Sequence, residues 1–92
     1  MSWLDAARQA VEAAARQATI DHMAQAFANP DRNARVEAAD ALRARFVARR
    51  AEVDEAAWAR FDRGLDTAVE TQSIEELVAG IDALDAARQR RL

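Results

Sequence analysis

The scarcity of helix-breaking residues constrains this chain more than any other feature. Its 92 residues include two glycines and one proline, and no stretch alternates apolar and polar side chains with the period of two that a half-buried strand requires. Apolar side chains recur instead three and four residues apart, as they do on one face of an α-helix. The sequence therefore predicts an all-α fold, a small antiparallel bundle of four helices that forms one domain over residues 1–92.

The first helix is predicted over residues 2–28. Ser2 is a candidate N-cap, and Asp5 follows in the first turn, where a carboxylate is favourable. The Asn29-Pro30-Asp31 turn ends this helix and begins the second one, because proline restricts the residue before it and suits a first helical turn. Since the turn is short, we expect the first two helices to be antiparallel neighbours.

The end of the second helix is the least determined boundary. Asp54 is a good N-cap for a third helix over residues 55–71. However, neither glycine nor proline interrupts residues 45–63, so one long helix over residues 30–71 is an alternative that gives three helices in total. The apolar stripe of the second helix comprises Val36, Ala39, Leu42, Phe46 and Val53.

The last two helices have clearer patterns. Gly64 falls off the apolar stripe of the third helix, which predicts a close contact with another helix there. Ser73 and Glu76 have the spacing of a capping box at the start of the fourth helix. The third helix carries the apolar residues Trp58, Phe61, Leu65, Ala68 and Val69, and the fourth carries Ile74, Leu77, Val78, Ile81 and Leu84.

Composition and charge exclude several classes of function. All thirteen basic residues are arginine, sixteen residues are acidic, and the net charge is −3, so the chain lacks the basic footprint of a nucleic-acid-binding protein. It contains no cysteine, which excludes a disulfide framework and a thiol nucleophile. No uncharged apolar run is long enough for a signal peptide or a membrane span. We therefore expect a cytoplasmic protein with no membrane and no nucleic-acid partner.

Residues that could carry chemistry are few. His22 is the sole histidine, and a helical metal site needs a second ligand three or four residues away, where this chain has Ala18, Thr19, Gln25 and Ala26. The acidic pairs at residues 54–55 and 75–76 stand where helices begin, so they stabilise helix N-termini. We expect no metal, no cofactor and no catalytic residue.

Two charged arrays are the main candidates for an interaction site. On the second helix Arg32, Arg43 and Arg50 fall within one narrow band, and on the third helix Asp62, Asp66 and Glu70 form an acidic ridge at four-residue spacing. The simpler interpretation pairs the two arrays across the bundle. The alternative directs one array outward, toward an oppositely charged protein. Trp3, near the start of the first helix, is a further candidate for an exposed anchor.

These observations predict a non-enzymatic protein–protein interaction module, such as an adaptor, an inhibitor, or an antitoxin-like or chaperone-like regulator that acts through an amphipathic helical surface. A second hypothesis is a self-assembling helical subunit, for example a homodimer with the alanine-rich first helix as its seam. A third is a small ligand-binding or enzymatic bundle with a pocket between helices. The residues considered for such a pocket are His22, Arg43, Arg50, Asp85 and Arg88.

Overall fold

The computed structural model describes residues 2–91 and confirms the all-α prediction. Its α-helices are α1 (Trp3–Phe27), α2 (Arg32–Phe46), α3 (Glu55–Thr71) and α4 (Glu75–Arg91). A short 3₁₀ helix, η1 (Val47–Glu52), follows α2 directly. Within residues 2–91 there are four α-helices and no strand.

The caps explain where the first three helices begin. Ser2 accepts a hydrogen bond from the Asp5 backbone N–H at 3.3 Å, as predicted. Asp31 caps α2 through the N–H of Asn33, so Pro30 lies just before the cap and not in the first helical turn. Asp54 accepts from the N–H of Ala57 at 2.8 Å and caps α3. Each cap satisfies a backbone donor that the helix itself leaves without a partner.

The alternative of one long helix over residues 30–71 is wrong. After Phe46 the chain tightens into η1, and Val53 is extended with φ −127° and ψ 161°. Asp54 is extended as well, as an N-cap residue should be. The capping preference of one aspartate therefore outweighs the helical propensity of the alanine- and arginine-rich residues around it.

The corner between α3 and α4 differs from the prediction. Helix α4 begins at Glu75, one residue later than a Ser73 cap requires, and the Ser73 backbone N–H donates to Thr71 Oγ1 at 3.2 Å. The predicted capping box with Glu76 is therefore wrong. The left-handed residue that ends α3 is Gln72, with φ 63°. Its side-chain amide donates to the carbonyl oxygens of Ala28 and Asn29, which connects this corner to the α1–α2 turn.

The core lies around α3. Phe61 is fully buried, and its ring lies 5.3 Å from that of Phe46 and 5.2 Å from that of Trp58. These tilted arrangements are the ones that aromatic rings prefer. The other large side chains with almost no exposed surface come from α1, α3 and α4: Met23, Phe27, Leu65, Leu77 and Leu84.

Two glycines allow α3 and α4 to pack backbone against backbone, as the position of Gly64 predicts. A Cβ on Gly64 would lie 2.7 Å from the carbonyl oxygen of Glu76 and from the Cα of Leu77. A Cβ on Gly80 would lie 2.7 Å from the Cα of Phe61. Only a residue without a side chain fits such an approach, so both glycines set the distance between these helices.

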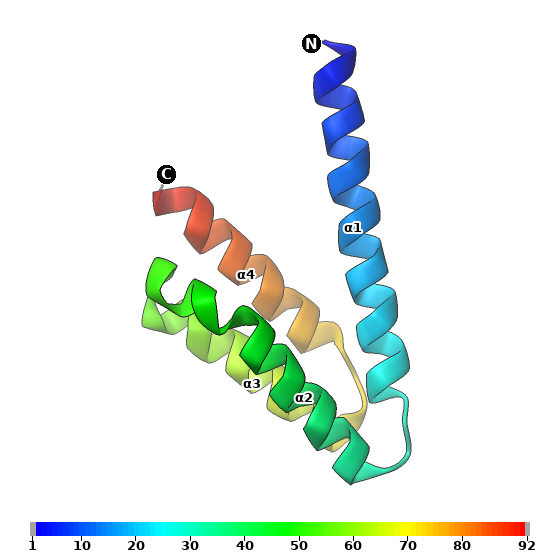
Figure 1. Ribbon diagram of the computed structural model, residues 1–92. Coiled ribbons are helices and arrows are strands. Elements are labelled where there is room, and N and C mark those ends of the chain that lie inside the picture. The colour runs from blue at the N-terminus through cyan, green and yellow to red at the C-terminus, as the bar shows by residue number, and fades with distance from the viewer. Residues whose placement is uncertain (1, 92) are drawn as a thin grey trace.

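Helix α1 packs against the other three helices near its C-terminal end and diverges from them toward its N-terminus. Figure 1 shows α2, α3 and α4 lying side by side, with α1 joined to them at its C-terminal end and its N-terminus projecting away. The molecule is correspondingly elongated, with extents of 47 × 27 × 19 Å. Met23 and Phe27 are the buried residues of α1. We refer to residues 3–18 as the arm and to α2, η1, α3 and α4 as the bundle.

Candidate functional site

Two of the three arginines in the predicted band pair with the acidic ridge of α3. Arg43 Nε donates to Asp62 Oδ1 at 2.5 Å, and Arg43 Nη2 donates to Asp66 Oδ1 at 3.0 Å. Arg32 Nη2 donates to Glu70 Oε1 at 2.6 Å. The hydrogen bond that Arg43 donates to Asp62, with the charges of both aspartates, raises the pKa of Arg43 above its ordinary value. These two arginines and the acidic ridge therefore hold α2 against α3.

Arg50 takes a different position from the other two arginines. Its guanidinium carbon lies 5.5 Å from the centre of the Trp58 ring, a cation–π arrangement. Beside this pair lies a surface groove of about 840 Å³, whose lining includes Val47 and Val53. Trp58 and Arg50 belong to the residue types that dominate binding energy at interfaces, but Trp58 is partly buried here against the core.

Trp3, the remaining predicted site residue, is at the start of the arm with 77% of its surface exposed. Leu4 and Val11 are also on the arm and are 61% and 68% exposed. At about 100° per residue, a strip of apolar residues runs along the arm with Trp3 at its border. We define it as the outer face, and its members are Leu4, Ala7, Val11, Ala14 and Ala18.

The outer face points away from the bundle. Ile20, Met23 and Phe27 pack into the core, and their helical positions lie on the side of α1 roughly opposite the outer face. Three charged residues of the arm lie on its bundle-facing side, namely Asp5, Glu12 and Arg16, and Arg8 borders the outer face beside Leu4. The outer face is therefore an exposed strip without charge, on a helix whose other side faces the bundle.

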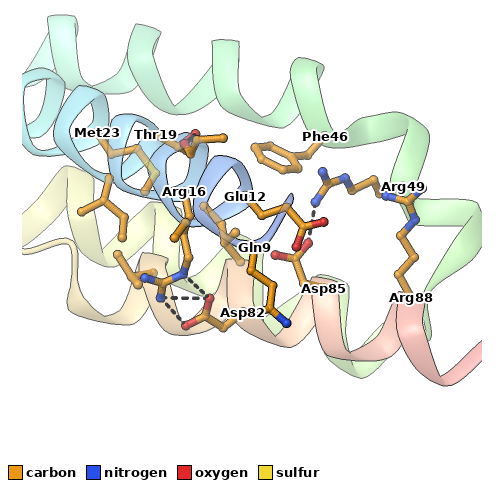
Figure 2. A pocket seen from close by; sticks show the side chains of 15 residues that line it. Gln9, Glu12, Arg16, Thr19, Met23, Phe46, Arg49, Asp82, Asp85 and Arg88 are labelled. Atoms are coloured by element: carbon orange, nitrogen blue, oxygen red, sulfur yellow. Dashed lines mark hydrogen bonds and ion pairs between the residues drawn. The ribbon is translucent and has the colours of Figure 1, made fainter. Parts of the chain in front are cut away.

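A cleft separates the arm from α4. It has a volume of about 620 Å³, and its apolar lining includes Met23, Phe46, Val78 and Ile81. Its rim is charged: Arg16 Nη2 donates to Asp82 Oδ2 at 2.9 Å, and Arg49 Nη1 donates to Asp85 Oδ1 at 2.9 Å. Figure 2 shows Arg16 facing Asp82 and Arg49 facing Asp85. The Arg16–Asp82 pair directly connects the arm to α4.

The cleft contains part of the pocket considered from sequence. Asp85 and Arg88 line it, whereas His22, Arg43 and Arg50 do not. His22 is exposed on α1. Arg16, Arg49 and Asp82 line the cleft and were missed, because they are surface charges in sequence and come from distant parts of the chain.

Arg35 is a further residue that sequence reasoning missed. It is 8% exposed, and it donates to three backbone carbonyls: Nε to Val69 at 2.7 Å, and Nη1 to Asn29 at 2.9 Å and to Pro30 at 3.0 Å. A buried guanidinium needs such partners. Arg35 therefore joins the α1–α2 turn to the C-terminal end of α3. It thereby fixes the C-terminal end of α1, which is the base of the arm.

Two kinds of functional feature are absent from residues 2–91. No three histidine, cysteine, aspartate or glutamate residues in this range are grouped so that they could hold a metal ion. None of the helices there combines the length and the apolarity needed to cross a membrane. The geometry within this range thus consists of the outer face, the cleft, the groove beside Trp58 and the ion pairs between helices.

Comparisons with known proteins extend this picture no further. No family model matches the chain, and no curated protein and no solved structure is significantly similar to it.

Proposed function

We propose that this chain is a non-enzymatic protein–protein interaction module that binds its partner through the outer face of α1. The observation that carries the proposal is the exposure of Trp3, Leu4 and Val11 on a helix that projects from the bundle. Adaptors, inhibitors, and antitoxin-like or chaperone-like regulators act in this way, by presenting a surface to another protein.

The energetics of the arm support this proposal. Burying one large apolar side chain contributes about 1.5–3 kcal/mol, and Leu4 and Val11 leave most of that contribution unused in the free chain. Trp3 belongs to the residue type that most often dominates binding energy at interfaces. An amphipathic helix of this kind binds by laying its apolar strip against a groove or another helix. The bundle then serves as the support that holds the arm.

The use of the charged groups also supports a non-enzymatic role. Arg16, Arg43 and Arg49 each form ion pairs with carboxylates on other helices. Catalytic groups are commonly recognised by strongly perturbed pKa values inside a cleft. Arg43, whose pKa is raised, does not line the α1–α4 cleft; it lines the open groove beside Trp58, and the cause of its raised pKa is its pairing with Asp62 and Asp66 of α3. The charged groups of the cleft rim are therefore best explained as connections between helices.

The test compares two variants that add the same charge to opposite sides of the arm. Val11→Asp places a carboxylate on the outer face, and Gln9→Asp places one on the side that faces the cleft. Circular dichroism first shows that the wild type and both variants are equally helical. Each tagged protein is then incubated with a lysate of the organism that naturally produces this chain. We expect a specific protein to be captured by the wild type and by Gln9→Asp, and to be lost with Val11→Asp. Equal capture by Val11→Asp contradicts the proposal, and so does the absence of any specific capture, with the untagged copy of the chain itself counted among the proteins that can be captured.

The cleft favours a second candidate function, the binding of a small ligand. Its volume of about 620 Å³ falls within the range of ligand pockets, and an apolar lining with a few polar groups is typical of them. Titration of the ¹⁵N-labelled protein with a library of small aromatic fragments, followed by NMR, tests this candidate. Saturable shifts in the amide signals of Val78 and Ile81 support it, and their absence across the library contradicts it.

A further inference from the structure

We propose that the partner of the outer face is the same face of a second copy, with the two α1 helices antiparallel. This inference rests on the proposed function and names the partner. The outer-face residues at positions 4, 7, 11, 14 and 18 are separated alternately by three and four residues, which is the spacing of a two-helix seam. Because the arm leaves the bundle, this seam is open to another helix.

The sizes of the seam residues select the antiparallel direction. Of the seam positions, 4, 11 and 18 form one class and hold Leu4, Val11 and Ala18, whereas 7 and 14 form the other class and hold only alanine. In a parallel pair the large residues would face each other and the alanines would face each other, which leaves uneven gaps. In an antiparallel pair, Leu4 faces Ala14 of the second copy and Val11 faces its Ala7. Large against small fills each layer evenly, as close packing requires.

Charge also favours a copy of the same face over a charged partner. No charged residue lies on the outer face itself, and Arg8 at its border is exposed and lies 3.7 Å from Asp5 of its own helix. A strip without charge offers no ion pair to a basic or an acidic protein, whereas its own copy leaves no charge buried without a partner. Antiparallel helices also place opposite dipole ends beside each other.

The arrangement of the molecule permits this pairing. The antiparallel register is centred near residue 9, and the bundle lies along residues 9–23 of α1 on the side opposite the outer face, so it leaves the seam free. The bundle-facing side of α1, with Met23 and Phe27, points away from the seam. Residues 3–18 extend about 24 Å, and the seam holds two large side chains per copy, Leu4 and Val11, so the contact belongs to the weak and transient class of interfaces. We therefore expect a reversible dimer with a dissociation constant in the micromolar range.

Sedimentation equilibrium across micromolar concentrations provides the first test. Wild type and Gln9→Asp should approach twice the monomer mass of 10.1 kDa as concentration rises. Val11→Asp should remain at the monomer mass over the same range, a shift of at least tenfold in the dissociation constant. Wild type that stays monomeric at all these concentrations, or Val11→Asp that dimerises as the wild type does, overturns the inference.

Disulfide formation provides a second test, which reports the direction of the helices. The chain has no cysteine of its own, so Ala7→Cys and Val11→Cys each introduce a single thiol. An equimolar mixture is oxidised, and the products are separated by mass. The antiparallel register predicts that the mixed disulfide exceeds the statistical half of the dimers. A parallel pair predicts the two homodimers instead, and this result, or a Gln9→Cys control that cross-links equally well, contradicts the inference.

The two proposals fail in distinguishable ways. A monomer that still captures another protein through Val11 removes the self-pairing and leaves the interaction module in place. A monomer that captures no specific protein removes both. A dimer that is lost with Val11→Asp, and that captures no other protein, identifies the second copy as the partner and limits the function to self-assembly.

Discussion

The bundle and the arm are both helical, but they are helical for different reasons. In the bundle, α3 buries Phe61, Leu65 and Ala68 completely, so packing stabilises its helices. In the arm the large apolar residues are exposed, and the helix depends on alanine, the residue with the highest helical propensity. One short chain therefore contains a region stabilised by its own contacts and a region whose apolar contacts are left open.

This difference shows why exposure on the arm is more informative than exposure elsewhere. Little of the arm is stabilised by packing, because the arm is attached to the bundle at one end. Its connection to α4 is the exposed Arg16–Asp82 pair. A helix in this position gains stability when a partner covers its outer face, which couples binding to the ordering of the arm.

The largest effect on the free energy of unfolding is expected when one apolar side chain is truncated in the core and compared with one truncated in the arm. Phe61→Ala removes a fully buried ring that contacts Phe46 and Trp58, and it should lower the free energy of unfolding by about 3–5 kcal/mol. Val11→Ala removes an exposed side chain and should change the free energy by less than about 0.5 kcal/mol at concentrations where the chain is monomeric. Urea unfolding followed by circular dichroism measures both values. Similar losses for the two variants would mean that the arm is packed as the bundle is.

A second prediction concerns the close approach of α3 and α4. Gly64→Ala places a Cβ 2.7 Å from backbone atoms of α4, so a helix has to move, at a cost of about 1–3 kcal/mol. Part of this cost is offset because alanine is the better helix former by about 1 kcal/mol. Thermal unfolding should show a net loss of stability, whereas the reverse change Ala14→Gly on the arm should reduce helicity without affecting the bundle. A Gly64→Ala protein more stable than the wild type would contradict the close packing.

The third prediction tests how the base of the arm is fixed. Arg35→Met keeps an apolar stem but removes the donors to the carbonyls of Val69, Asn29 and Pro30. Leaving such buried acceptors without partners should cost about 1–3 kcal/mol. Arg45→Met is the control, because Arg45 is exposed on the same helix, and its effect should stay within about 0.5 kcal/mol. Equal denaturation midpoints for the two variants would exclude the structural role of Arg35.

The sequence predicts the bundle better than the arm, and the reason is physical. Stripes such as Phe61, Leu65 and Ala68 recur at helical spacing, so local pattern alone identifies the buried side. The arm carries alanine on nearly every side, which specifies a helix but no direction of packing. Whether Asp54 caps a new helix or lies inside a longer one depends on the balance between capping and helical propensity, which a sequence pattern does not give. The left-handed end of α3 is also unmarked, because Gln72 stands where glycine is the usual residue.

The candidate site was only partly predictable. Trp3 is exposed as an anchor should be, and the pairing of Arg43 with the acidic ridge follows from helical spacing. The rim of the cleft could not be anticipated, because Arg16 and Asp82 are 66 residues apart and each resembles an ordinary surface charge. Arg35 gives no sequence signal either, since its partners are backbone carbonyls, which no residue type encodes.

The smallest expected effect on stability concerns the connection between the two regions. Arg16→Ala removes the ion pair with Asp82, in which both side chains are about half exposed, so the free energy of unfolding should fall by no more than about 1 kcal/mol. The position of the arm should change much more, because this pair connects it to α4 beyond the buried part of α1. Spin labels on Ala6→Cys and Ala86→Cys should give a broader and longer distance distribution in the Arg16→Ala protein than in the otherwise identical chain. High salt should broaden the distribution of the parent chain in the same way, since screening weakens exposed pairs. An unchanged distribution would mean that packing at Ile20 and Met23 alone sets the angle of α1. The Arg16–Asp82 pair would then have no part in holding the arm beside the bundle.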